Sequence, residues 1–146
     1  MKTSSKRYTD LANFLALGGA RRALLLRAFA ALLVFKGLHR LLSFRLLRRL
    51  AGTRTAHPGA LSPETVEATA WAVRVVSAKS PVAFTCLVQA LTARWLLGGH
   101  PDLRVRLGVQ RGPAEPFAAH AWLEWRGRVV LGDQTGPTFT PLFEWS

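Results

Sequence analysis

Residues 103–109 read LRVRLGV, and every second position of this stretch is apolar. A period of two places the apolar side chains on one face of a β-strand and the arginines on the other. Residues 117–125 and 128–133 predict two more strands, joined by a two-residue loop at Arg126-Gly127. We therefore expect an antiparallel sheet in the second half of the chain.

The chain before this sheet has the composition of helices. Residues 11–50 contain no proline and are dense in Ala, Leu and Arg, which predicts two or three helices. After a loop, Ser62-Pro63 predicts the start of a helix that runs to about Ala78, because serine caps helices well and proline suits the first helical position. Helices followed by an antiparallel sheet predict the α+β fold class.

A second helix start lies close behind and can be placed in two ways. Either Ser80 or Thr85 could act as the N-cap. The choice decides whether Cys86 lies in the first turn of the helix or about one turn deeper. Beyond the last strand, Pro137 and Pro141 predict an irregular tail that carries aromatic residues.

Composition and charge bound the kind of protein. The 146 residues are 49% hydrophobic and 19% charged, which indicates a globular unit and excludes a disordered tail or a coiled coil. The formal charge is +12, and residues 1–54 hold twelve Lys or Arg against one acid. We expect a single domain over residues 1–146, with a basic helical segment at 1–55 and a catalytic core at 56–146.

Several classes of site and location are excluded or not indicated. A single cysteine excludes an internal disulfide framework and a zinc or iron–sulfur site of the CxxC type. No phosphate-binding glycine motif occurs and no histidine pairs with a cysteine at zinc spacing, so we expect neither a metal nor a cofactor. Arginines interrupt every apolar run before it reaches the roughly 18 residues of a bilayer span. No secretion signal is recognisable, and the expected location is cytoplasmic.

Three residues combine into a candidate catalytic triad. If residues 126–127 form the whole hairpin loop, His120 and Asp133 are directly opposed, with β-carbons roughly 4.5–5.5 Å apart. A carboxylate at that range can hold one imidazole nitrogen and leave the other to act as a base. Cys86 would supply the nucleophile, because the positive end of a helix favours a thiolate and first-turn N–H groups would face an oxyanion.

The same hairpin register places other residues beside His120, and the three triad residues also have a purely structural interpretation. The register places His120 on one sheet face with Trp122, Glu124, Val129 and Leu131, so Trp122 would form a wall of the substrate cleft. Taken singly, the cysteine and the histidine could each be buried core, and the aspartate a turn residue. Their coincidence in one arrangement indicates a cysteine nucleophile with its base and orienting acid.

Four segments carry a resemblance to a known family. TCLVQAL at residues 85–91, the strand at 103–109, AHAWLE at 119–124 and the strand at 127–133 resemble the transglutaminase-like B2 proteins of lasso peptide biosynthesis. The resemblance covers residues 62–133. It implies a papain-like or transglutaminase-like core.

The resemblance also implies an activity and partners. The family members are leader peptidases that cleave a ribosomally made precursor peptide, which implies Cys86 as nucleophile, His120 as general base and then acid, and Asp133 as the orienting acid. A separate B1 leader-recognition protein and the lasso cyclase are the implied partners. In papain, a glutamine six residues before the cysteine supplies a side-chain donor to the oxyanion. This chain has no glutamine at that position, so the backbone amides near Cys86 are the expected oxyanion donors.

Two other functions remain open. The same triad can transfer an acyl group to an amine, as transglutaminases do. Alternatively, the chain is a non-enzymatic basic module for nucleic acid or an anionic membrane, although no nucleic-acid motif is recognisable and nucleic acid is not an expected partner. We expect the basic helices at residues 11–50 to dock an acidic partner or leader segment, with peripheral membrane contact as a further option, and about 0.5 M salt should weaken that contact.

Overall fold

The computed structural model describes residues 13, 15–52, 59–110, 118–132 and 140–145. Helices come first and strands follow, which confirms the α+β prediction. The elements are α2 (Gly19–Leu41), α3 (Phe44–Gly52), α4 (Pro63–Lys79), α5 (Cys86–Leu96), β1 (Leu103–Gln110), β2 (Ala118–Trp125), β3 (Arg128–Leu131) and β4 (Thr140–Trp145).

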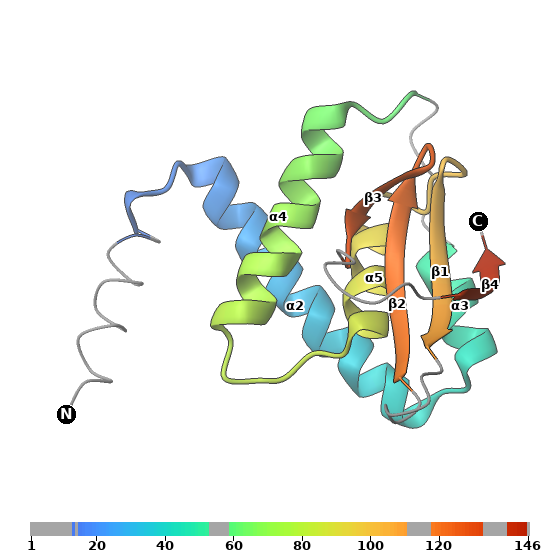
Figure 1. Ribbon diagram of the computed structural model, residues 1–146. Coiled ribbons are helices and arrows are strands. Elements are labelled where there is room, and N and C mark those ends of the chain that lie inside the picture. Colours follow the sequence, from blue (N-terminus) through green and yellow to red (C-terminus); the bar gives the residue numbers. More distant parts are fainter. Residues whose placement is uncertain (1–12, 14, 53–58, 111–117, 133–139, 146) are drawn as a thin grey trace.

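The four strands form one antiparallel sheet in the order β3-β2-β1-β4. Helix α5 packs against this sheet, mainly on β2, and α2 packs against both α4 and α5 (Figure 1). Leu32 of α2, Leu91 of α5 and Leu123 of β2 are each fully buried in the same core. The core is therefore shared by the basic helical segment and by the sheet that follows it.

The predicted start of α4 is confirmed. Ser62 adopts an extended backbone conformation, and its Oγ accepts a hydrogen bond from the backbone N–H of Thr65 at 3.2 Å. Pro63 occupies the first helical position, where the missing N–H is not needed. Local capping chemistry is sufficient to place this helix end.

The hairpin between β2 and β3 has the predicted loop and a different register. Arg126 and Gly127 have φ values of 51° and 79°, as a two-residue turn with both central residues left-handed requires. The predicted pairing holds at Trp125↔Arg128 and shifts by one residue at Leu123↔Leu131. A β-bulge inserts one extra residue into β3, and this turns the following side chains to the opposite face.

The bulge corrects one sequence expectation. Leu131 was expected to share a face with His120, but it is 3% exposed and belongs to the core beside Leu123. Strand alternation places His120, Trp122 and Glu124 on the other face of β2. The register from which the opposition of His120 and Asp133 was inferred therefore does not extend past the bulge.

The C-terminal stretch corrects a second expectation. Residues 140–145 were expected to be irregular, yet they form the edge strand β4, which pairs with β1. The pairing shifts between Leu107 and Gly108, and Pro141 lies opposite Gly108 at this irregularity. Proline is tolerated in edge strands and at bulges, where its missing N–H removes no central ladder bond.

Helix α2 has 23 residues, which is enough length to raise the question of a membrane span. Within the described part of the chain, no helix combines the length and hydropathy that crossing a bilayer requires. Arginines recur along α2 and account for this result.

Candidate active site

The structure decides between the two proposed starts of the helix that carries Cys86. Thr85 is the N-cap, and its Oγ1 accepts a hydrogen bond from the backbone N–H of Val88 at 3.3 Å. Ser80 instead terminates α4, and its Oγ accepts a bond from Val82 N at 3.0 Å. Cys86 is thus the first residue of α5 and is half-buried.

This position puts backbone donors next to the thiol. The first intrahelical bond of α5 runs from Gln89 N to Thr85 O at 3.0 Å, and the cap takes the N–H of Val88. The N–H groups of Cys86 and Leu87 come before these bonds and have no carbonyl acceptor within the helix. They can stabilise negative charge on an oxygen bound near the cysteine.

Two side chains hold the loop before Cys86 by hydrogen bonds to its backbone carbonyls. Lys36 of α2 donates from Nζ to the carbonyl oxygen of Ala83 at 2.7 Å, and its ammonium lies 5.6 Å from the ring centre of Phe84. Gln89 donates from Nε2 to the carbonyl oxygen of Phe84 at 3.1 Å. The carbonyls of Ala83 and Phe84, three and two residues before Cys86, are therefore anchored, one of them by the basic N-terminal segment.

Sequence reasoning missed both of these hydrogen bonds. Gln89 lies in the first turn of α5, three residues after Cys86, and a polar side chain there is a weak local signal. Lys36 is 47 residues from Ala83 in the chain, so no local pattern relates the two. The contact between Lys36 and Ala83 depends on the packing of α2 against α5.

His120 lies near the beginning of β2 and is held by the backbone of the neighbouring chain segment. Its Nε2 lies 3.0 Å from the carbonyl oxygen of Gly132. A carbonyl can only accept, so Nε2 carries the proton, and in the neutral ring Nδ1 is the basic nitrogen. Among the described residues, the Gly132 carbonyl thus provides an orienting contact for the imidazole.

The candidate nucleophile and base lie at the same end of the molecule. In Figure 1, α5 begins at the end of the sheet where β2 also begins, and the two elements pack together. Among the described residues the Cys86 thiol makes no hydrogen bond to His120, and such contacts often tighten only when substrate binds. Asp133 lies outside the described residues, so its place in the triad stays a prediction.

Trp122 joins His120 to a polar network on the same face of β2. The two rings are stacked, with centroids 6.1 Å apart and planes at 18°. Trp122 donates from Nε1 to Glu124 Oε1 at 2.9 Å, and Glu124 pairs with Arg106 of β1 at 2.9 Å. Trp122 is 3% exposed, so it supports the imidazole from one side. Its expected role as a cleft wall stays a prediction.

Glu124 and Arg106 were not singled out from the sequence as site residues. The available signal was the spacing of two between His120, Trp122 and Glu124, which places all three on one strand face. Arg106 lies next to this group because it is opposite Trp122 in the pairing of β1 with β2. The ion pair of Glu124 with Arg106 holds the Trp122 ring through the Nε1 bond to Glu124. The stacked Trp122 ring in turn restricts the imidazole of His120.

Gly132 is expected to tolerate no side chain. Its φ is +83°, and an added Cβ would lie 2.8 Å from the carbonyl oxygen of Ala121 and 2.9 Å from Cβ of Trp122. Gly132→Ala should therefore lower the free energy of unfolding by about 2–4 kcal/mol. Thermal unfolding should show a Tm lower by about 5 °C or more.

Gly127→Ala is the matched control for this prediction. Its φ is +79°, but an added Cβ would meet nothing within 4 Å, so the cost is backbone strain of about 1 kcal/mol. If both variants lower the free energy of unfolding by the same amount, the close approach of Gly132 to β2 does not contribute to the cost of the substitution.

Comparison with known proteins places this arrangement in a wider group. The family model described as the transglutaminase-like superfamily matches residues 29–144. The matched range includes Lys36, Cys86 and His120. No curated protein and no solved structure matches the chain.

Proposed function

The chain belongs to the transglutaminase-like superfamily, which includes cysteine proteases and acyl-transferases, and from this we propose a cysteine peptidase that cleaves lasso peptide leaders. The observation that carries the proposal is the placement of Cys86 at the capped start of α5, at the end of the sheet where His120 is held by Gly132. The motif resemblance to B2 proteins supplies the substrate class, a ribosomally made precursor peptide.

The proposed reaction uses each group in a defined role. The Cys86 thiol loses its proton to Nδ1 of His120, and the thiolate attacks the carbonyl carbon of the last leader residue. The N–H groups of Cys86 and Leu87 stabilise the oxyanion. The C–N bond breaks as the imidazolium returns its proton to the departing core amine, and water then hydrolyses the thioester with His120 as the base.

The proposal includes partners and a location. A B1 recognition protein holds the leader, and the freed core peptide passes to the lasso cyclase. All of these steps take place in the cytoplasm. Asp133 would orient the imidazole together with the Gly132 carbonyl, and its replacement by asparagine tests that contribution.

The first test is mass spectrometry of a candidate precursor incubated with this protein and the B1 partner in ¹⁸O-labelled water. Hydrolysis should release one leader fragment that carries a single ¹⁸O atom in its new carboxyl group. An unlabelled leader joined to an added amine would replace the peptidase proposal by acyl transfer. Intact precursor, with the B1 protein shown to bind the leader, would count against both enzymatic functions.

Lys36 is expected to act as a positioning residue for the nucleophile. Lys36→Met removes the charge-assisted bond to Ala83 O and frees the loop before Cys86. Small displacements of a nucleophile are costly, so kcat should fall by about tenfold while KM changes little. The measurement is a steady-state cleavage assay with the B1 partner present.

Two further variants make this prediction specific. Lys36→Arg keeps a long cationic donor and should recover most of the lost kcat. Arg74→Met removes an exposed cation from α4, whose Nε bonds within its own helix, and should leave kcat unchanged. A Lys36→Met enzyme with normal kcat, or with a loss confined to KM, would contradict the positioning role.

A further inference from the structure

Helix α2 is apolar on two opposite faces. On the inner face, Leu25, Leu32 and Phe35 are at most 6% exposed and belong to the core. On the outer face, Leu26 is 59% exposed and Leu33 is 41% exposed. An apolar helix face is normally packed against another element, so a second apolar face indicates a second packing partner. Within the described residues nothing covers the outer face of α2.

The outer face has the spacing of a helix–helix contact. Its exposed residues form a line, here called the α2 seam: Ala23, Leu26, Ala30, Leu33, Gly37 and Leu41. Leucine recurs after seven residues at 26 and 33, and a small residue recurs after seven at 23, 30 and 37. Alternating steps of three and four residues are the pattern of two helices packed lengthwise.

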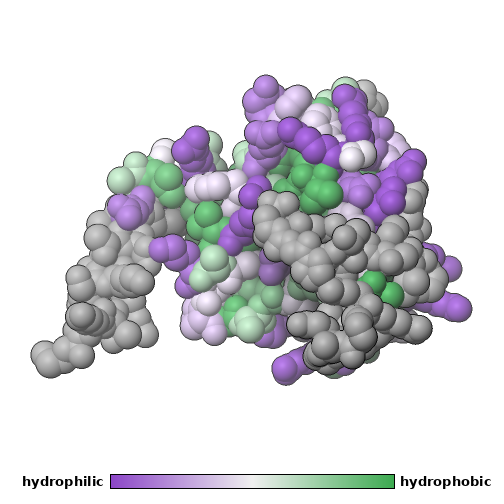
Figure 2. Space-filling view, in the orientation of Figure 1, coloured by the Kyte–Doolittle hydropathy of each residue, from purple (hydrophilic) through white to green (hydrophobic). Residues whose placement is uncertain are grey.

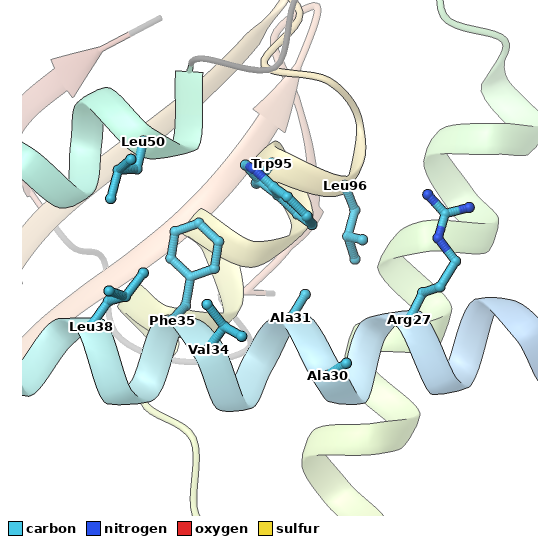
Figure 3. Close-up of a pocket in the computed structure, with 9 residues that line it drawn as sticks. All are labelled: Arg27, Ala30, Ala31, Val34, Phe35, Leu38, Leu50, Trp95 and Leu96. Carbon is cyan, nitrogen blue, oxygen red and sulfur yellow. The ribbon is translucent and has the colours of Figure 1, made fainter.

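Two apolar grooves open onto the seam. One has a volume of about 490 Å³, lies between α2 and α4, and is lined by Leu26 and Phe29 among others. The other, about 370 Å³, lies between α2, α3 and α5 and is lined by Ala30 and Val34 among others (Figure 3). A helix laid on the small residues of the seam could place its longer side chains into these grooves.

The positive side chains around the seam favour a partner with negative charge. The sequence has no Asp or Glu from residue 11 to residue 63. Arg22, Arg27 and Arg40 flank the seam, and Arg45 and Arg49 follow on the exposed side of α3. Figure 2 shows hydrophobic and hydrophilic surface side by side over the start of α2. An apolar line between arginines fits a helix whose own apolar line lies between acidic residues.

The same observations argue against two other occupants. A second copy of this chain would bring arginines against arginines, because α2 and α3 contain no acid. An interfacial membrane helix uses large side chains to enter the bilayer, whereas half of the seam is Ala or Gly. Small residues are useful where another helix backbone approaches closely.

We propose that the α2 seam is a docking site for an acidic, amphipathic α-helix of a partner protein. The proposal does not rest on the peptidase chemistry, because the seam contains no residue of the candidate active site. The Cys86→Ala protein should therefore bind the helix as the natural chain does.

A designed peptide tests the proposal on the full chain. The probe is a fluorescent 21-residue helix with Leu at positions a and d and Glu at positions e and g of each heptad. A matched peptide carries Lys in place of every Glu. Fluorescence anisotropy should show the Glu peptide binding at least about tenfold more tightly than the Lys peptide, with weaker binding in about 0.5 M salt.

Variants of the chain locate the binding site. Gly37→Leu fills a close-approach position, and its added Cβ meets nothing within 4 Å, so the free protein should fold as stably as before. It should weaken binding of the Glu peptide by about tenfold, and Leu33→Asp should do so as well. Val129→Asp alters an apolar residue of similar exposure on β3 and should leave binding unchanged.

Three results would overturn the proposal. The first is equal binding of both peptides, or of neither. The second is Glu-peptide binding that Gly37→Leu and Leu33→Asp leave intact. The third is assignment of the seam to another occupant, shown by a dimer that Gly37→Leu dissociates or by co-sedimentation with phosphatidylserine vesicles that Leu33→Asp abolishes.

Discussion

Replacing Cys86 by alanine is expected to lower the rate of precursor cleavage by about 10⁴-fold or more. Cys86 is the single thiol of the chain and the first residue of α5, next to backbone N–H groups that have no helical acceptor. Alanine carries no nucleophilic atom, so the thioester at this position cannot form. The measurement is a mass-spectrometric time course of leader release with the proposed B1 partner present.

The alanine variant should fold normally, which makes the result interpretable. The Cys86 thiol is half-buried and makes no hydrogen bond among the described residues, and alanine favours the helix. Circular dichroism and thermal unfolding should therefore match the natural chain closely. Cleavage at an unchanged rate by a folded Cys86→Ala protein would rule out the cysteine mechanism.

Replacing His120 by glutamine is expected to lower the cleavage rate by about 10²–10⁴-fold. Glutamine can still donate a hydrogen bond to the carbonyl of Gly132, which His120 Nε2 contacts at 3.0 Å, but it has no basic nitrogen. The variant should therefore remove proton transfer and retain most of the local structure. Two rates are measured, leader release and alkylation of Cys86 by iodoacetamide.

Alkylation makes the His120 prediction independent of the substrate. Because the chain has one cysteine, a single adduct reports the reactivity of Cys86, and His120→Gln should slow its formation. Trp122→Phe keeps a ring beside the imidazole and loses the Nε1 bond to Glu124, so its rates should fall less than tenfold. If the His120→Gln variant is alkylated and cleaves the precursor as fast as the natural chain, a residue other than His120 acts as the base.

The basic N-terminal helices have a structural role that their charge did not reveal. Lys36 crosses from α2 to the loop before Cys86, and the inner face of α2 completes the core on which α5 rests. Removing this segment would expose α5 and release the loop. Arg27 and Arg40 of the same helix are exposed and flank the seam.

Local signals predicted much of the fold correctly. Ser62 caps α4 as expected, residues 103–109 lie in a strand that buries Leu103 and Val105, and Arg126-Gly127 forms the hairpin loop. Each signal depends on contacts between residues at most four positions apart, or on backbone angles within one turn. Short-range energies of this kind are specified by the residue types themselves.

The candidate site was predicted in part. The sequence placed Cys86 near a helix start and His120 on a strand, and the structure confirms both placements. It left open whether Ser80 or Thr85 is the cap, because both residues suit that position. The packing of α4 decided it, since α4 runs as far as Lys79 and uses Ser80 as its own terminus.

What the sequence by itself determined is therefore the helices from α4 onward and the first three strands, the fold class and the two central candidates for chemistry. The tertiary structure alone decided the bulge in β3, the pairing of β4 with β1 and the bond from Lys36 to Ala83. These features join segments far apart in the chain, so their energy depends on how whole elements pack. No pattern within one segment encodes that packing, and the contact of the Gly132 carbonyl with His120 depends on the pairing of β2 with β3.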